Sequence, residues 1–126
     1  MLAKNNRLRG TKEWEVLFNE GAFVGARDLT MKAWKIELDK YPRRQFKVTD
    51  LKIGFSVGVK ISKSAVKRNA VRRKMREVIR LLLKENKIKI GYLIGFMAKN
   101  SILEADYHKI EEDIIFCLKK SRLLIQ

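Results

Sequence analysis

Residues 51–77 read LKIGFSVGVKISKSAVKRNAVRRKMRE, a segment that joins a strand-like pattern to a helix-like one. Its first part alternates apolar residues with small or charged ones, which is the period of a strand with one buried face. The apolar residues are Leu51, Ile53, Phe55 and Val57. After a basic loop, Ser62 or Ser64 is suited to cap a long helix that continues to about Asn86. One side of this helix is apolar at helical spacing, through Val71, Met75, Val78, Ile79 and Leu82. The stretch therefore predicts a strand followed by a helix that packs on a sheet.

The same helix has a second, basic face. Residues 60–80 contain nine basic residues and one acid, Glu77, so this segment carries 9 − 1 = +8 of the formal net charge of +15. Asn69 shares one arc of the helix, beside the apolar side, with Arg72, Arg73, Arg76 and Arg80. Guanidinium groups donate forked hydrogen bonds that match phosphate oxygens. Since one acid is too few to neutralise this face, we favour contact with RNA or DNA over a solvated face.

The residues before this stretch predict a helix, a strand and a connection. Thr11–Asn19 places apolar side chains at helical spacing, with Thr11 as candidate N-cap and Gly21 as stop signal. Leu29–Leu38 alternates like a strand, and a slip of phase at Ala33-Trp34 suggests a bulge. Asp39–Asp50 contains the only proline and is expected to be an exposed connection, with strand character at Gln45–Val48.

The residues after it predict one more strand and one more helix. Tyr92–Lys99 is mostly apolar, as in a central strand buried on both faces. A final amphipathic helix is indicated by Tyr107, Ile110, Ile114, Cys117, Leu118 and Ser121. The order helix, strands, helix, strand, helix predicts an α+β fold in which three helices cover a small mixed sheet of about four strands. We expect one domain over residues 1–126, an α/β sandwich with a βαβ crossover around the helix that carries Arg68 and Asn69.

Composition excludes several classes of protein. The chain has 126 residues and is 46% hydrophobic, as expected of a folded domain rather than a disordered basic tail. One cysteine and one histidine exclude an intrachain disulfide and a Cys/His zinc cluster, which needs about four ligands. The longest apolar stretch, Gly91–Ala98, is far below the ~20 residues of a membrane span, and no signal peptide is visible. We therefore expect a cytoplasmic protein without membrane contact, whose partner is a nucleic acid.

The quoted stretch resembles the signature of one family, the protein subunit of bacterial ribonuclease P. Arg68, Asn69, Arg72, Arg73, Arg76 and Glu77 stand at the spacing of its Arg-Asn motif, although Ala70 replaces a residue that is usually basic. The N-terminal residues Asn6-Arg7-Leu8-Arg9, followed by Trp14, Phe18 and Gly21, are similar to the family's opening pattern. GYLIGFMAK at residues 91–99 is similar to its last strand. The likeness spans nearly the whole chain in order.

This resemblance implies a protein with no catalytic residue of its own. In such a ribonucleoprotein the RNA subunit removes the 5′ leader of precursor tRNA by Mg²⁺-dependent hydrolysis, with the metal held mainly by RNA and none bound tightly by the protein. The implied partners are that catalytic RNA and precursor tRNA, with no obligatory protein partner. The residues implied to bind RNA, in the motif helix and its loop, are Lys60, Lys63, Lys67, Arg68, Asn69, Arg72, Arg73, Arg76 and Arg80.

The resemblance also implies a cleft between the first helix and the sheet that holds the single-stranded leader. The candidate cleft residues are Arg7, Arg9, Trp14, Phe18, Lys32, Lys52 and Ser56. Trp14 and Phe18 lie one helical turn apart and are suited to stack on unpaired bases. Aromatic residues at this spacing are also common in cores, and of the two we expect Phe18 to be the one partly in the core.

Three other functions remain open from the sequence. A ribosomal-type protein that binds structured RNA would share the basic helix without needing a leader cleft, and it is the main alternative. A stand-alone nuclease needs clustered carboxylates or a histidine base, whereas Asp28, Asp39 and Asp50 are isolated among cations. A helix-turn-helix DNA reader is disfavoured because a strand, not a short helix, precedes the basic helix.

Overall fold

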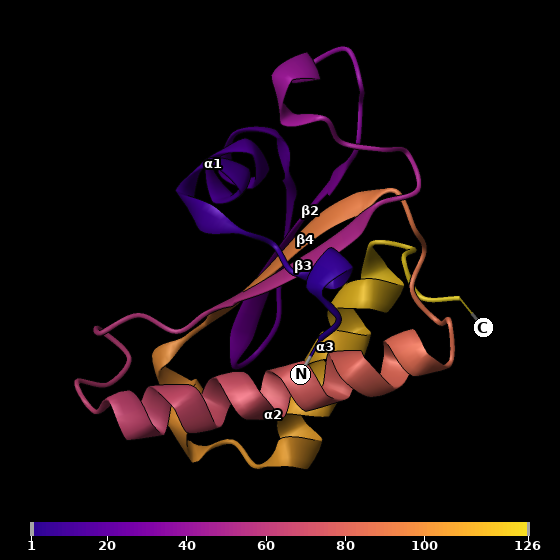
Figure 1. The fold of residues 1–126 in the computed structure, drawn as a ribbon. Coiled ribbons are helices and arrows are strands. Elements are labelled where there is room, and N and C mark those ends of the chain that lie inside the picture. The colour runs from indigo at the N-terminus through magenta and orange to yellow at the C-terminus, as the bar shows by residue number, and fades with distance from the viewer. Residues whose placement is uncertain (1, 126) are drawn as a thin grey trace.

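Figure 1 shows the computed structural model, which describes residues 2–125. Three helices surround one sheet: α1 (Gly10–Glu20), α2 (Ala65–Lys84) and α3 (Tyr107–Lys120). The strands are β1 (Ala22–Gly25), β2 (Leu29–Lys35), β3 (Leu51–Ser56) and β4 (Tyr92–Ala98). Short 3₁₀ turns occupy Lys4–Asn6, Pro42–Arg44 and Asn100–Glu104. The predicted α+β class with three helices and a four-stranded sheet is confirmed.

The strands are ordered β1-β2-β4-β3 in a mixed sheet. β1 and β2 form an antiparallel hairpin, and β2 also pairs antiparallel with β4. β3 runs parallel to β4, and α2 connects the two, so the predicted βαβ crossover is present. The strand Ala22–Gly25 was not expected from the sequence, and the strand character expected at Gln45–Val48 is wrong, since those residues follow a 3₁₀ turn outside the sheet.

Both faces of the sheet are covered, which explains the slip of phase in β2. Met31 points to the face packed by α2 and α3, whereas Trp34 points to the face packed by α1. The pairing of β2 with β4 continues without interruption through Ala33 and Trp34, so the expected bulge is absent. The slip of phase instead marks the point where the large apolar side chains of β2 change from the α2 and α3 face of the sheet to the α1 face. β4 contributes Phe96 to the first face and Leu93 to the second, as predicted for a strand buried on both sides.

Two glycines let α1 lie close to the sheet. Gly54 of β3 and Gly95 of β4 are neighbours in register and face α1. A Cβ atom at Gly54 would lie 2.7 Å from Cζ2 of Trp14, and one at Gly95 would lie 2.6 Å from both Trp14 and Leu17. Because no side chain stands between them, Trp14 and Leu17 rest directly on the strands. We call Gly54 and Gly95 the glycine floor.

The ends of α1 differ in part from the prediction. The helix begins at Gly10 with Arg9 as N-cap, so Thr11 lies in the first turn and is not the cap. The Glu13 carboxylate accepts a hydrogen bond from the backbone N–H of Arg9, whereas the Arg9 side chain makes no cap hydrogen bond to the first turn. Gly21 is the C-cap, as expected.

The N-terminal residues cover part of the β3 edge. Arg7 forms an isolated parallel bridge with Ile53, and the Leu8 N–H donates to the Ile53 carbonyl at 3.1 Å. The Asn6 side-chain amide donates to the Leu51 carbonyl at 2.9 Å. The N-terminal segment is thereby placed beside the strand that precedes α2. Within residues 2–125, no helix is long and apolar enough to cross a membrane.

Candidate nucleic-acid interface

The loop that enters α2 is ordered by serine and arginine hydrogen bonds. Ser64 is the N-cap, and its side chain accepts from the Lys67 N–H at 3.3 Å. The Ser62 hydroxyl accepts from the Ser64 N–H at 3.1 Å, so both predicted serines take part. The Arg68 guanidinium donates to the Ser62 carbonyl at 2.8 Å. Arg68 therefore fixes the loop against the helix.

Arg72 is held in a defined orientation at the start of α2. Its guanidinium donates to the Asn69 side-chain oxygen at 2.7 Å and to the Val57 carbonyl at 3.0 Å. Val57 is the residue after β3, so Arg72 joins the helix to the end of the strand. The oxygen of Asn69 is used in this contact. Two of the predicted motif residues thus form one fixed unit.

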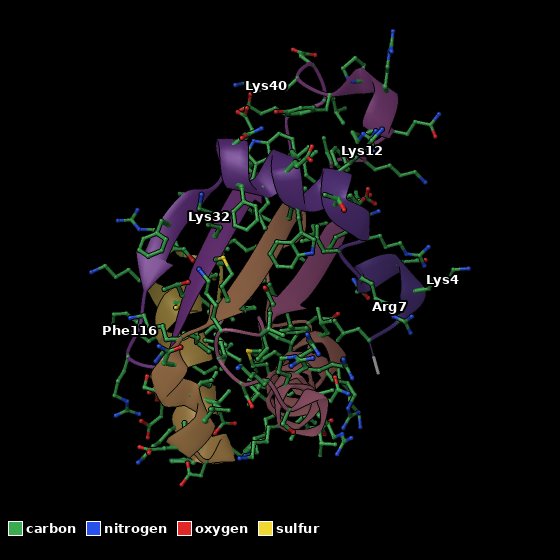
Figure 2. All side chains as sticks on the ribbon, turned by 90° about the vertical axis from the view of Figure 1, so that its left-hand side faces the viewer. Lys4, Arg7, Lys12, Lys32, Lys40 and Phe116 are labelled. Atoms are coloured by element: carbon green, nitrogen blue, oxygen red, sulfur yellow. The ribbon has the colours of Figure 1, made fainter. Side chains whose placement is uncertain are left out.

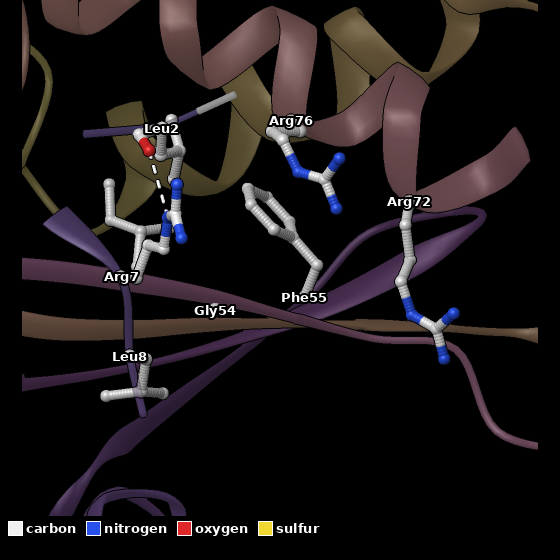
Figure 3. A pocket seen from close by; sticks show the side chains of 8 residues that line it. Leu2, Arg7, Leu8, Gly54, Phe55, Arg72 and Arg76 are labelled. Carbon is white, nitrogen blue, oxygen red and sulfur yellow. Dashed lines mark hydrogen bonds between the residues drawn. The ribbon is translucent and has the colours of Figure 1, made fainter. Parts of the chain in front are cut away.

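Arg72 and Arg76 face a hollow between α2 and the N-terminal segment, shown in Figure 3. In this view Phe55 lies below Arg76, with Arg7 to its left and Arg72 to its right, and its ring stacks on Phe96 with centroids 6.0 Å apart. Arg7 enters from the opposite side, where its Nε donates to the Leu2 carbonyl at 2.9 Å. We call this the arginine hollow, and it is lined by Leu2, Arg7, Leu8, Ile53, Gly54, Phe55, Arg72 and Arg76.

A second hollow lies between α1 and the sheet. It is open to solvent, and we call it the stacking hollow; its lining residues are Gly10, Thr11, Trp14, Phe18, Phe55, Ser56, Val57 and Arg72. Trp14 and Phe18 contact each other with ring centroids 5.8 Å apart and planes inclined by 32°. Phe55 and Arg72 line both hollows, so the two join at these residues. Three predicted cleft residues, Trp14, Phe18 and Ser56, therefore lie together beside a predicted motif arginine.

The roles expected of the two aromatic residues are reversed. Phe18 is 48% exposed, so the expectation that it is the one partly in the core is wrong. Trp14 is half-buried because its ring rests on the glycine floor. The residues of α1 that are fully buried are Val16 and Leu17. Helical spacing alone could not show that the Trp14 ring lies over two glycines of the sheet, Gly54 and Gly95.

The two lysines of the predicted cleft make specific contacts. The Lys32 ammonium donates to the Phe18 carbonyl at 2.9 Å and lies 5.3 Å from the centroid of the Phe18 ring. It places a positive charge beside the exposed aromatic face. The Lys52 ammonium forms an ion pair with Glu13 at 3.2 Å, in which both side chains are largely buried. Lys52 therefore ties β3 to α1 and brings little net charge to a ligand.

Arg9 and Lys52 lie in a third hollow rather than with Trp14. Its walls are the N-terminal 3₁₀ turn, the loop before β3 and β3 itself. We call it the lysine hollow, and it is lined by Lys4, Asn5, Arg9, Gln45, Lys47, Asp50 and Lys52. The structure thus divides the residues of the predicted cleft between separate hollows.

The remaining motif residues differ in how free their charges are. Lys60, Lys63, Lys67 and Arg73 are exposed on the loop and the outer side of α2. Arg80 instead forms two hydrogen bonds with the Glu77 carboxylate, at 2.9 and 2.6 Å. These hydrogen bonds lower the pKa of Glu77, so the pair stays ionised and its charges balance. The free positive charge is therefore concentrated toward the N-terminal half of α2.

The sequence did not identify the sheet residues that extend the exposed surface. Phe23 of β1 is 63% exposed and pairs across the strands with Lys32, which places both on the α1 face. Met97 lies between Thr30 and Ser56 in the register of the sheet. The alternation of side chains along β4 could have indicated that Met97 lies on the exposed face of the sheet. Phe23 could be placed there only if β1 was recognised as a strand, and the sequence did not predict β1. These residues continue the sheet surface beside the stacking hollow.

The described acidic residues do not gather into a cluster that could hold a metal ion. Among residues 2–125, no group of three or more His, Cys, Asp or Glu side chains is arranged so that it could hold a metal ion. The two buried carboxylates are structural, since Asp113 accepts from the Asp28 N–H at 2.7 Å and Asp28 pairs with Arg27 at 3.1 Å. Both buried carboxylates are thus engaged in contacts within the fold.

Comparisons with known proteins agree on one family. A family model described as Ribonuclease P matches residues 2–122. The ribonuclease P protein component of Caldanaerobacter subterraneus subsp. tengcongensis is 34% identical over 123 residues, which cover 98% of this chain and 95% of that protein. The ribonuclease P protein component of Clostridium botulinum (strain Langeland) is 34% identical over 118 residues, covering 94% of this chain and 96% of that protein.

Solved structures show the same fold. A mutant RNase P protein of Staphylococcus aureus matches with a TM-score of 0.78 at 18% identity, covering 95% of this chain and 91% of that one. The RNase P protein of Thermotoga maritima matches with a TM-score of 0.70 at 21% identity, covering 90% and 96% of the two chains.

Proposed function

The chain belongs to the ribonuclease P protein family, and from this membership we propose how its surfaces serve the ribonucleoprotein. The protein is a subunit of an endoribonuclease that matures the 5′ end of tRNA, and the RNA subunit carries the catalysis. Its partners are therefore the ribonuclease P RNA and precursor tRNA. The alternative of a ribosomal-type RNA-binding protein is not favoured.

We propose that the exposed cations around the start of α2 bind the catalytic RNA. Lys60, Lys63, Lys67 and Arg73 point away from the core and are free to contact phosphates. Arg68 and Asn69 act with them by keeping the loop and the first turn of α2 in place. Arg80 contributes less, since its guanidinium is already engaged by Glu77.

We propose that the stacking hollow holds nucleotides of the leader. Phe18 offers an exposed ring for stacking, Trp14 supports it, and Lys32 lies beside the ring to meet a phosphate. The observation that carries this proposal is the place of Arg72, which lines both the stacking hollow and the arginine hollow with Arg7 and Arg76. A leader in the stacking hollow therefore lies next to the helix that binds the catalytic RNA.

The residues present do not fit a protein-held metal, so we propose that Mg²⁺ of the holoenzyme is held mainly by RNA phosphates. Asp39 and Asp50 lie in a loop with Arg43, Arg44 and Lys47, which disfavours a divalent cation there. The net charge of +15 assists by reducing the repulsion between two RNA molecules. We also propose that residues 1–126 act as one domain and that the protein works in the cytoplasm, where its RNA partners are made.

The test is reconstitution at low Mg²⁺. Adding the protein to the ribonuclease P RNA of the same organism should restore cleavage of precursor tRNA at the mature 5′ end, under conditions in which the RNA alone is nearly inactive. The cleavage site and the rate are measured with end-labelled precursor. A protein that binds the RNA without stimulating cleavage would contradict the proposed function and favour a structural RNA-binding role.

A further inference from the structure

The lysine hollow carries positive charge that the proposed function does not use. Lys4, Arg9 and Lys47 are exposed, and their charged groups form no hydrogen bond or ion pair with other residues of the described chain, 2–125. The fourth cation, Lys52, is balanced by Glu13. Asp50 is the one acid in the lining, and its carboxylate accepts from the Lys47 backbone N–H at 2.9 Å. The hollow therefore keeps a net positive charge.

The walls of this hollow are fixed by contacts to the core. Phe46 is buried beside Trp34, with ring centroids 5.8 Å apart, and this anchors the neighbouring Lys47. The same loop is tied to α1 at Glu20, which accepts from the Lys40 ammonium at 2.9 Å and the Tyr41 hydroxyl at 3.0 Å. On the other wall, the hydrogen bond from Asn6 to the Leu51 carbonyl holds the turn that carries Lys4. The cations are thus presented by a preformed surface.

The chemistry of the lining selects the backbone of a nucleic acid over its bases. The hollow contains cations and the side-chain amides of Asn5 and Gln45, and no aromatic residue among its lining that a base could stack on. The stacking hollow, in contrast, is lined by three aromatic residues and one arginine. Phosphate contacts from lysine and arginine add affinity without sequence preference.

The lysine hollow and the stacking hollow meet at the start of α1. Arg9 lines the first and Gly10, the next residue, lines the second. Gly10 has a φ of +65° and no atom within 4 Å of the place where a Cβ would stand, so the surface between the hollows is open. Figure 2 shows Lys4 and Lys12 at the same end of α1, with Phe116 of α3 far across the view. A nucleic acid strand leaving the stacking hollow past Gly10 reaches Arg9 and Lys4.

We propose that the lysine hollow binds the phosphodiester backbone of the leader upstream of the nucleotides in the stacking hollow. This inference rests on the proposed function. The direction follows from Arg72, because the end of the stacking hollow near α2 faces the catalytic RNA, so the leader nucleotides closest to the cleavage site lie there. The part of the leader farther toward its 5′ end then passes over Gly10 into the lysine hollow.

The experiment compares two leader lengths with one double variant. Lys4→Gln/Lys47→Gln removes two charges from exposed side chains and should leave the thermal unfolding temperature unchanged. Affinities of the holoenzyme are measured for precursor tRNA with leaders of about 4 and about 15 nucleotides, the range of site sizes known for single-strand binders. The variant should bind the long-leader precursor about 3- to 10-fold more weakly and the short-leader precursor as well as the unmodified protein does. For the long leader, the slope of the logarithm of the binding constant against the logarithm of the salt concentration should decrease in magnitude by about 1.4, because two phosphate contacts at about 0.7 each are lost.

A charge-matched control separates this site from a general effect of charge. Lys109→Gln/Lys119→Gln also removes two positive charges, here from exposed positions of α3. It should leave the affinities for the long-leader and the short-leader precursor unchanged. Equal losses for the two leader lengths, no loss for either, or weaker binding of the catalytic RNA alone would each overturn the inference. If the unmodified protein stimulates cleavage and the long leader gives no advantage, the inference fails while the proposed function stands. If the unmodified protein does not stimulate cleavage, the proposed function itself fails.

Discussion

Arg72 and Arg80 lie about two turns apart on one face of α2, and the structure gives them different partners. The guanidinium of Arg72 is oriented by neutral oxygens, those of Asn69 and Val57, so its charge is available to a phosphate. The guanidinium of Arg80 is neutralised by Glu77. Arg72 and Arg80 belong to the same basic face of the helix, but only Arg72 has a guanidinium charge available to a phosphate.

Replacing the two arginines should expose this difference. Arg72→Gln is expected to weaken binding of the catalytic RNA about 3- to 10-fold and to lower the salt dependence by about 1, whereas Arg80→Gln should have a smaller effect on both. Arg72→Lys should fall between, because it keeps the charge and loses the forked donors. Affinity is measured at several salt concentrations, with thermal unfolding as the check on folding. Equal losses for Arg72→Gln and Arg80→Gln would show that the pairing with Glu77 does not matter.

Phe18 and Trp14 should separate binding from stability. Phe18→Ala is expected to reduce affinity for leader-bearing tRNA, by about 1–3 kcal/mol per lost base stack, and to change the unfolding temperature little, since the ring is 48% exposed. Trp14→Ala should lower both the affinity for leader-bearing tRNA and the unfolding temperature, because the Trp14 ring also covers the glycine floor. Mature tRNA serves as the control ligand. An equal loss of affinity for mature and precursor tRNA would assign Phe18 a role in folding.

At the scale of elements, the sequence predicted every long helix and the strands β2, β3 and β4. The long helices and β3 have a regular pattern with one buried side, as in Leu51, Ile53 and Val57, and β4 is recognised as a mostly apolar run. The strand β1 was missed because its four residues are largely exposed and show no alternation of buried and exposed positions. The phase slip at Trp34 was misinterpreted because a sheet with helices on both faces buries residues of both phases. Contacts between distant elements, not local patterns, decide these cases.

The glycine floor sets the position of α1 and should be sensitive to one methyl group. Gly95→Ala places a Cβ 2.6 Å from side-chain atoms of Trp14 and Leu17, so these side chains, or α1 with them, must move away from the sheet. Overpacking of this kind costs about 1–3 kcal/mol in the free energy of unfolding. Chemical denaturation measures the cost, and leader affinity should fall with it. Gly58→Ala adds the same methyl group where the nearest atom is 4.0 Å away, so it should leave both quantities close to normal.

At the scale of the whole molecule, the densest group of basic residues lies in the loop before α2 and on α2, over residues 60–80, while α3 carries acids such as Glu111 and Glu112 among its lysines. Like charges of the basic surface repel each other in the folded protein. We expect the unfolding temperature to rise as salt is increased from about 0.01 M to about 0.1 M, over which the screening length falls from about 30 Å to about 10 Å. Scanning calorimetry in sodium chloride tests this. A temperature that stays constant over this range would show that the surface charges are too far apart to repel.

The class of partner could be inferred from the sequence, whereas the separation of the arginine, stacking and lysine hollows could not. Net charge and the arc of arginines on α2 were visible in the spacing of residues. The lysine hollow joins residues from the N-terminus, the loop before β3 and β3 itself, and its existence depends on how Phe46 anchors that loop. Nothing in the local sequence marks Lys4 and Lys47 as neighbours.

The N-terminal residues beside β3 have a consequence for self-association. An open sheet has two edges whose unpaired backbone groups can recruit strands from another molecule and start aggregation. Here Arg7 and Leu8 occupy part of the β3 edge, and the opposite edge is β1, which is only four residues long. Such short or occupied edges are a common defence against edge-to-edge pairing. The segment that helps form the binding surface thereby also protects one edge of the sheet from pairing with another molecule.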